Sequence, residues 1–405
     1  MKTDARSVEL LINRHLHIYR DGLLLDTVPF WERHSPDQVH GGLFTFLDHD
    51  GTLISTDKPM WLNGRGAWLF ARLYNQVEPR EQWLQLSRQV IEFVSQHGFD
   101  HDGRMFFLVT RDGRPLRKRR YLFTETFATI ALAEYARASG CQEYLDRARE
   151  LFRLILRYHR TPGLLPPKVE PKTRPMQALA MPMILIATAQ VMRSVDDDSL
   201  YDEVINAAIQ TVTRDFARPE LRALLETVGE DGSFLNLPEG REVNPGHAIE
   251  TAGFILDEAE RRNDRDLIEL ACRIIDWSLD LGWDEQFGGI YCFRDCKRLP
   301  VPRLEHDMKL WWPHNEAIYS TLLAYHLTGR SHWLDWYQKL HDWTYRHFPD
   351  PQHGEWFGYL HRDGTIASTL KGNLWKGPFH LPRMQLKCWQ LLERMAASPV
   401  ADAQN

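Results

Sequence analysis

Residues 125–140 read ETFATIALAEYARASG, and this stretch decides the fold class. Apolar residues recur along it at helical spacing, and Gly140 follows as a glycine suited to end a helix. The same pattern returns in four further stretches, residues 83–98, 244–264, 266–282 and 315–329. Asn244 is a predicted N-cap, and Pro245 fits a first helical turn. The pattern predicts about a dozen helices along the chain.

Short hairpin segments separate these helices. Each combines an Asp/Gly turn with an aromatic-rich strand, and they open near residues 30, 97, 228, 281 and 347. Asp-Gly pairs stand at residues 50–51, 102–103, 112–113 and 363–364. Glycine tolerates the positive φ that tight hairpin turns require. The segments are therefore predicted to be β-hairpins between helices.

The repeat spacing of about 50 to 65 residues indicates a repeat architecture. Paired helices at this period predict an all-α fold, an (α/α)6 barrel with six inner helices, six outer helices and short β-hairpins over one mouth. No Pro/Ser/Gly-rich linker divides the 405 residues. Residues 1–396 are therefore expected to form a single catalytic domain, and residues 397–405 a flexible polar tail.

Composition excludes several classes of function. The net charge of −6 argues against a nucleic-acid partner, because such proteins carry a basic face. The start of the chain lacks a secretory apolar segment, and no apolar run approaches the roughly 18 residues that span a bilayer. Five scattered cysteines are typical of reduced thiols, so we expect a cytoplasmic protein. The run RKRR at residues 117–120 is interpreted as a solvated face or a local anion contact near the barrel mouth.

Two candidate site segments lie within predicted helices. Arg65 stands among aromatic residues, including Trp61, so it is either a surface residue or a buried charge that needs an anionic partner. His247 and Glu250 are spaced i, i+3 in the first turn of a helix, hence on one face. A carboxylate there would hold the imidazole in one tautomer and raise its basicity.

Two further segments contain candidates. MKLWWPHNEA contains Lys309, Trp312, His314 and Glu316 at the start of a helix. NLWKGPFHLPR, residues 373–383, places His380 among glycine and proline, away from a regular helix face. All four segments stand at the head of a helix or beside a hairpin. In an (α/α)6 barrel they would converge at one mouth.

At these motifs the sequence resembles the N-acylglucosamine 2-epimerase family, also called renin-binding proteins. The resemblance runs from PFWERHSPDQVHGGLFTFLD to KGPFHLPR, and its most specific stretches include NPGHAIE, MKLWWPHNEA and RPMQALAMPMIL. It implies an (α/α)6 barrel, usually dimeric, that inverts C2 of a sugar. The expected partners are a small sugar and a second copy of the chain, with no nucleic acid and no membrane.

The resemblance also implies roles for residues. Arg65 matches an arginine that binds the C1 and C2 oxygens, and His247 and His380 match two acid/base histidines. The acidic partners and the ring-stacking tryptophans are matched by Glu250, Glu316, Trp312 and Trp375. We expect His247, His380, Arg65 and Glu316 to be catalytic. The expected substrate-binding residues are Glu250, Trp312, Trp375, Trp61, Lys309 and His314.

The chemistry explains why two histidines are needed. Ring opening exposes a C1 carbonyl, a base removes the C2 proton, and an arginine stabilises the enediolate. Returning the proton to the opposite face requires a second acid/base group. This route requires no metal and no cofactor. ATP activates several family members, but the matching loop, residues 160–175, has few basic residues, so we expect no strong ATP dependence.

The substrate is predicted from departures within the family. Relatives acting on unsubstituted sugars tend to carry a histidine in the segment RPMQALAMPMIL, where this chain has methionines. N-acetyl-D-glucosamine and N-acetyl-D-mannosamine are therefore the expected pair. Gly66 and Ala67 are expected to reshape the pocket near Arg65. The alternatives are an epimerase or aldose–ketose isomerase of sugars such as mannose and glucose, an (α/α)6 glycoside hydrolase using Glu250 and Glu316, and a pure binding protein.

Overall fold

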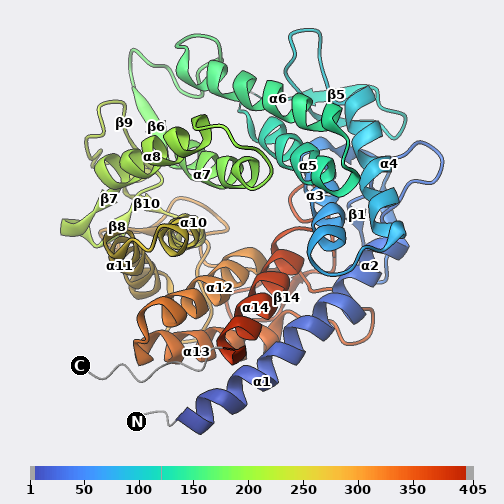
Figure 1. The fold of residues 1–405 in the computed structure, drawn as a ribbon. Coiled ribbons are helices and arrows are strands. Elements are labelled where there is room, and N and C mark those ends of the chain that lie inside the picture. Colours follow the sequence, from blue (N-terminus) through green and yellow to red (C-terminus); the bar gives the residue numbers. More distant parts are fainter. Residues whose placement is uncertain (1–4, 120, 398–405) are drawn as a thin grey trace.

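The helical pattern of the sequence folds into two concentric rings (Figure 1). The computed structural model describes residues 5–119 and 121–397. The inner ring consists of α3 (Met60–Gln76), α5 (Phe123–Ser139), α7 (Ala180–Arg193), α10 (Pro245–Arg262), α12 (Trp311–Thr328) and α14 (His380–Ala397). The outer ring consists of α1 (Ala5–Asp21), α4 (Glu81–His97), α6 (Gln142–Arg160), α8 (Leu200–Thr211), α11 (Arg265–Gly282) and α13 (Ser331–His347). The predicted (α/α)6 barrel is confirmed.

The burial of side chains distinguishes the two rings. In α12 every residue from Pro313 to Tyr325 is buried, so the helix is covered on all sides. In α6 the buried residues form one stripe, Ala148, Leu151, Phe152, Ile155 and Leu156. Such a stripe faces the core and leaves the opposite side in water. Inner helices such as α12 are therefore buried on all sides, whereas outer helices such as α6 are amphipathic.

Neighbouring inner helices pack in chain order from α3 through α14. The ring closes where the amide of Gln390 in α14 donates to Gln76 in α3 at 3.2 Å. Ala397, which we assigned to the polar tail, is the last residue of α14, and residues 398–405 lie outside the described part. None of the helices in the described residues is long and apolar enough to cross a bilayer.

Helix ends follow the predicted signals. The Asn244 side chain accepts a hydrogen bond from the His247 backbone N–H and so caps α10. Gly140 and Gly329 end α5 and α12 with φ of 68° and 65°. These values lie in the left-handed region that glycine enters without steric penalty.

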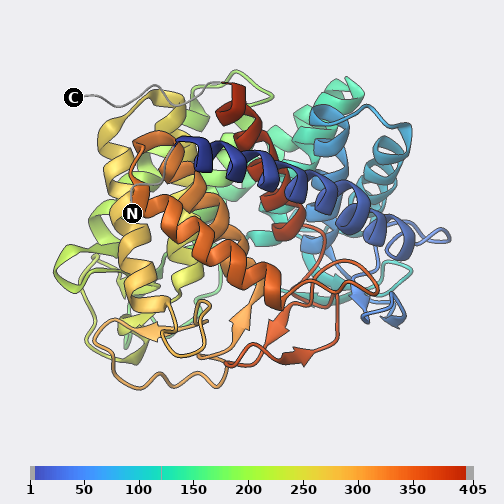
Figure 2. The same cartoon turned by 90° about the horizontal axis from the view of Figure 1, so that it is seen from below.

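Short strands and loops gather at one end of the barrel (Figure 2). The strands are β1 (Phe46–Leu47), β2 (Leu53–Ser55), β3 (Lys58–Pro59), β4 (Phe106–Val109), β5 (Pro115–Lys118), β6 (Met176–Ala178), β7 (Ala217–Arg218), β8 (Ala223–Leu224), β9 (Thr227–Gly229), β10 (Glu242–Val243), β11 (Arg294–Asp295), β12 (Lys309–Leu310), β13 (Tyr359–Leu360) and β14 (Ile366–Ser368). The remaining short elements are η1 (Gly22–Thr27), α2 (Val28–His34), η2 (Val212–Phe216), η3 (Pro219–Leu221) and α9 (Pro238–Arg241).

These strands position the inner helices. Antiparallel pairs form between β1 and β2, β4 and β5, and β13 and β14, around three of the predicted Asp-Gly turns. The turn glycines Gly51, Gly113 and Gly364 have positive φ, as predicted. β3 and β12 run directly into α3 and α12, and one residue separates β10 from α10. The hairpins therefore hold the N-terminal turns of inner helices at one mouth.

Candidate active site

A cavity of about 1510 Å³ lies inside the inner ring. Each inner helix contributes to its wall, as shown by Trp61, Phe127, Ile184, Glu250, Trp312 and His380. Arg65 and His247 line the same cavity. The structure therefore brings together the arginine and both histidines that the sequence singled out.

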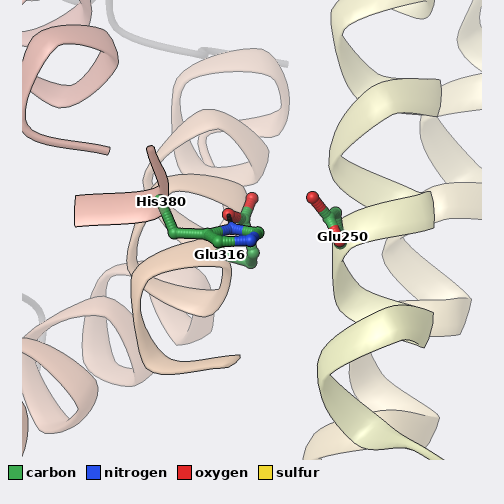
Figure 3. A group of neighbouring side chains, drawn as sticks. All are labelled: Glu250, Glu316 and His380. Atoms are coloured by element: carbon green, nitrogen blue, oxygen red, sulfur yellow. Dashed lines mark hydrogen bonds and ion pairs between the residues drawn. The ribbon is translucent and has the colours of Figure 1, made fainter. Parts of the chain in front are cut away.

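His380 is the first residue of α14 and is buried against Glu316 of α12. Its Nδ1 lies 2.7 Å from Glu316 Oε1, so the Nδ1–H donates to the carboxylate. Figure 3 shows the two side chains together, with Glu250 reaching toward them from α10. Because Nδ1 is occupied, Nε2 is left as the nitrogen free to exchange a proton in the cavity.

Arg383, one turn after His380, joins the two glutamates. Its Nη2 donates to Glu250 Oε1 at 2.7 Å and to Glu316 Oε1 at 2.6 Å. These contacts bind α10, α12 and α14 to one another through a buried charge network. Breaking such a network would leave an uncompensated buried charge, so it holds the helix ends in place.

His247 forms a second histidine–carboxylate pair. Its Nδ1 lies 2.9 Å from Glu226 Oε1, in the loop between β8 and β9. The sequence predicted that Glu250 would hold the imidazole tautomer and raise its basicity. The hydrogen-bonded partner is instead Glu226, because Glu250 is taken up by Arg383, but the charge of Glu250 still raises the pKa of His247. The Nδ1–H of His247 donates to Glu226, which again leaves Nε2 free.

Trp312 connects the two histidines. Its ring centroid lies 5.0 Å from that of His247 and 5.7 Å from that of His380. Because one indole contacts both imidazoles, they border the same part of the cavity. Trp312 is half-buried and lines the cavity, as predicted.

The surroundings give the two histidines opposite tendencies. Burial places the pKa of His380 well below its ordinary value of 6.5, and the cations Arg65 and Arg383 act in the same direction. Burial also disfavours the charged form of His247, but the carboxylates of Glu226, Glu250 and Glu242, Glu226 foremost, together outweigh burial and raise the pKa above 6.5. Near neutral pH the resting site therefore combines a neutral His380 with a His247 that favours its proton. A pair whose pKa values are pushed apart supplies one base and one acid.

Arg65 is a buried cation in an aromatic setting. Its guanidinium carbon lies 4.3 Å from the Trp61 ring centroid, 4.1 Å from that of Phe127 and 4.5 Å from that of Phe379. Its Nε has no hydrogen-bond partner among the described residues. Burial lowers the pKa of Arg65 to about 9, with Glu250 opposing the shift, so the group stays charged at neutral pH. It is a cation available to an anionic substrate oxygen.

Trp61 and Trp375 form an aromatic wall at the cavity. Their ring centroids are 5.7 Å apart in an edge-to-face arrangement, and both line the cavity. Trp375 is 47% exposed, which places it at the rim. Exposed aromatic faces in a cavity are suited to sugar rings.

Two predicted binding residues do not face the cavity. Lys309 is fully buried and donates to Asp284 at 3.1 Å, with its Nζ 3.8 Å from the Tyr291 ring centroid. His314 is fully buried, accepts from the Ile290 backbone N–H and stacks on Trp343. His314 lies on the face of α12 that packs against Trp343 of α13, whereas Lys309 precedes the helix in β12 and its side chain meets Asp284 instead of the cavity.

The predicted reshaping of the pocket by Gly66 and Ala67 is also wrong. Neither residue lines the cavity. A Cβ at Gly66 would lie 2.3 Å from Leu43 Cδ1, so this glycine permits a close approach of the loop between α2 and β1. By contrast, Met181 and Met183 of α7 do line the cavity. The methionine-rich segment therefore contributes an apolar part of the wall.

Glu226 and Arg383 are site residues that the sequence reasoning did not single out. Arg383 closes the motif KGPFHLPR and lies three residues after His380, so helical spacing was a usable signal. Glu226 lies 21 positions before His247 and comes from a separate loop. Only folding brings it to the imidazole.

Glu250, Glu316 and His380 also have the spacing of a metal site, with ligand atoms within 4.8 Å of one another. Both carboxylates, however, already accept from the Arg383 guanidinium, and Glu316 also accepts from His380. A metal ion would have to displace that guanidinium. These carboxylates therefore bind the Arg383 guanidinium in place of a metal ion.

Comparisons of the sequence and of the fold with known proteins point to the same family. The sequence model of the N-acylglucosamine 2-epimerase (GlcNAc 2-epimerase) family matches residues 42–380. A Mus musculus N-acylglucosamine 2-epimerase is 36% identical over 395 residues, covering 92% of each chain. Two solved structures share the fold. The cellobiose 2-epimerase of Bacillus thermoamylovorans has a TM-score of 0.82 at 20% identity, covering 94% of this chain and 100% of that one. A D-mannose isomerase has a TM-score of 0.77 at 16% identity, covering 95% and 97%. The chain belongs to the N-acylglucosamine 2-epimerase family.

Proposed function

We propose that this protein is a sugar 2-epimerase that interconverts N-acetyl-D-glucosamine and N-acetyl-D-mannosamine. The observation that carries the proposal is the pair of imidazoles around Trp312, with opposite pKa shifts and with Arg65 in the same cavity. Two acid/base groups of this kind suit a proton that leaves one face of a carbon and returns to the other.

The reaction begins with the open-chain sugar, whose C1 carbonyl makes the C2 proton acidic. In one direction the neutral His380 Nε2 takes the C2 proton, and the electron pair moves toward the C1 oxygen. Arg65 is buried and has no hydrogen-bonded carboxylate in the described part of the chain, so it stabilises the negative oxygen of the enediolate. Burial makes this stabilisation stronger than in water.

The second half returns a proton to C2 from the opposite side. His247, held by Glu226, donates it, and the C1 carbonyl forms again. The configuration at C2 is then inverted, His380 holds the proton it took, and His247 is neutral. Proton exchange with water restores the starting state. The reverse reaction uses the histidines in exchanged roles.

Two features support an N-acyl substituent at C2. Met181 and Met183 give the cavity an apolar wall that suits an acetyl methyl group. The Mus musculus relative, 36% identical, is named as an enzyme of N-acylglucosamine. The second candidate is the same enediolate chemistry on an unsubstituted aldose, which the fold shared with a D-mannose isomerase keeps open.

A glycoside hydrolase suits the site less well. That chemistry places a glycosidic oxygen between two carboxylates. Between Glu250 and Glu316 the structure instead has Arg383, bonded to both. Both histidines would then have no role.

Turnover in D₂O tests the proposal. The wild-type protein is incubated separately with N-acetylmannosamine and with mannose, and the products are followed by NMR. We expect conversion of N-acetylmannosamine to N-acetylglucosamine with deuterium at C2. Turnover of mannose alone would reject the N-acyl assignment, and a ketose product with deuterium at C1 would instead indicate an aldose–ketose isomerase.

The remaining parts of the proposal concern the state of the protein. The steps above use only side chains of this chain, so we propose activity without added metal, nicotinamide or ATP. We also propose a single catalytic domain, a cytoplasmic location and a homodimer. Assays with and without ATP and sedimentation of the purified protein test the nucleotide effect and the dimer.

A further inference from the structure

Among the described residues of the basic run 117–120, which excludes Arg120, Arg119 is explained neither by the fold nor by the proposed mechanism. Arg117 is exposed, and Lys118 is paired with Asp100 and Asp102, each at 2.7 Å. Arg119 instead lines the cavity. No carboxylate in residues 5–119 and 121–397 forms an ion pair with it, and its buried Nε has no hydrogen-bond partner there.

Aromatic rings hold the Arg119 guanidinium in place. Its carbon lies 4.3 Å from the Phe107 ring centroid and 5.3 Å from that of Trp375. Its Nη1 donates to Tyr121 Oη at 3.1 Å. The planar group therefore lies between aromatic faces, where cation–π attraction fixes it while most of its N–H donors stay available.

The backbone beneath Arg119 is also fixed. The guanidinium of Arg104 donates to the carbonyl oxygens of Arg119 at 3.2 Å and Tyr121 at 2.8 Å, and its Nε donates to buried Glu125. A donor held this firmly loses little entropy when it binds a ligand. The Arg119 guanidinium is therefore preorganised for binding.

The position of Arg119 relative to Arg65 indicates which part of a sugar it meets. The Trp61 ring lies against Arg65, and Phe107 lies next, 6.0 Å from Trp61 between ring centroids. Arg119 lies beyond this aromatic pair, beside the half-exposed Trp375. With C1 and C2 at Arg65, the other end of the sugar extends toward Arg119.

We propose that Arg119 is a substrate-binding residue whose guanidinium donates hydrogen bonds to hydroxyl oxygens at the end of the sugar remote from C1 and C2. The inference rests on the proposed sugar chemistry. It assigns Arg65 and Arg119 to opposite ends of one substrate, with the tryptophan wall between them.

Steady-state kinetics of Arg119→Gln test this role, with Arg117→Gln, in the strand β5 that directly precedes Arg119, as the matched control. We expect kcat/KM to fall by about 10- to 100-fold in Arg119→Gln, mainly through KM, as for a lost hydrogen bond to a charged donor. The control is expected to match wild type. Arg119→Lys keeps the charge but not the forked donors, and is expected to retain part of the binding.

Deoxy sugars separate binding from a structural role. The wild-type to Arg119→Gln ratio of kcat/KM is measured for the parent sugar and for its 4-deoxy and 6-deoxy analogues. The ratio should approach one for the analogue that lacks the hydroxyl bound by Arg119. An unchanged ratio with both analogues, or a ratio of one with the parent sugar, would overturn the inference.

The parent sugar is the one that the wild-type protein converts. The N-acyl assignment and the role of Arg119 are therefore tested independently. Conversion of mannose alone rejects the N-acyl assignment, and the same ratios with mannose and its deoxy analogues still decide the role of Arg119. If Arg119→Gln does not fold, the ratios are taken from Arg119→Lys, whose conserved charge preserves the aromatic stack.

Discussion

His380 and His247 are the same residue type in opposite electrostatic settings. His380 is buried beside two arginines, and its pKa is lowered. His247 is partly open to the cavity and bonded to Glu226, and its pKa is raised. The difference comes from neighbours on other elements, so each histidine depends on groups distant in the chain.

Removing the His380 imidazole tests its catalytic role. In His380→Ala we expect turnover to fall by about 10²- to 10⁴-fold, the usual loss for an acid/base group. His101→Ala is the control, because that side chain is 90% exposed. Circular dichroism is used to check that both variants fold. Unchanged turnover in His380→Ala would favour a pure binding role.

Glu226→Gln tests the origin of the His247 pKa. The carboxylate raises that pKa, so its loss lowers the pKa of His247. The two histidines titrate as a pair, and the basic limb of the kcat/KM profile reports loss of the proton from His247. In Glu226→Gln the basic limb should move to lower pH, so the bell-shaped pH profile of kcat/KM should become narrower. Glu305→Gln, also at the cavity but not bonded to His247, should leave the profile in place. A profile that does not narrow in Glu226→Gln would contradict the assignment.

At the level of elements, the N-terminal turns of inner helices place the site. Arg65, His247, Glu316 and His380 all stand within the first two turns of α3, α10, α12 and α14. The free backbone N–H groups of a helix N-terminus favour negative charge, which suits an enediolate. The hairpins that precede these helices therefore contribute to the site by fixing where each helix begins.

The caps of α10 and α11 provide a matched pair of variants. Asn244→Ala and Asp264→Ala each remove a side-chain cap, and each should lower the free energy of unfolding by about 0.5 to 2 kcal/mol. Only Asn244 holds the first turn that carries His247. Urea unfolding should therefore show similar losses, while activity should fall only in Asn244→Ala. Equal activity in the two variants would show that the Asn244 cap does not position His247.

At the level of the whole molecule, the two ends of the chain complete the barrel. α1 packs against α14, and its residues His15 and Tyr19 meet Tyr337 and His341 of α13 in a buried network. The two imidazoles stack with centroids 4.0 Å apart. This network ties the first outer helix to the last one.

Acid should weaken this closure. Burial lowers the pKa of His15 to about 4, and burial together with His15 lowers that of His341 further. Their unfolded pKa is near 6.5, so between pH 6.5 and 4 the unfolded chain binds more protons and stability falls as pH falls. Urea unfolding at pH 7, 6, 5 and 4.5 should show this slope. In His341→Gln the slope should be smaller. An identical slope in the variant would contradict the assignment.

The fold class and the main candidates of the site follow from the amino-acid sequence alone. Periodic apolar residues with Asn244 and Gly140 as end signals specify helices, because capping and amphipathicity are local properties. The motifs around His247 and His380, together with the family resemblance, named the histidines that meet in one cavity.

The ion-pair and hydrogen-bond partners of the site residues depend on the tertiary fold. Glu226, not Glu250, holds His247, and Arg383 bridges the two glutamates. Lys309 and His314 turn away from the cavity although they share a motif with Trp312. Local sequence sets a side chain's place on its helix, whereas its ion-pair partner and its exposure depend on helices and loops that packing brings together from far along the chain.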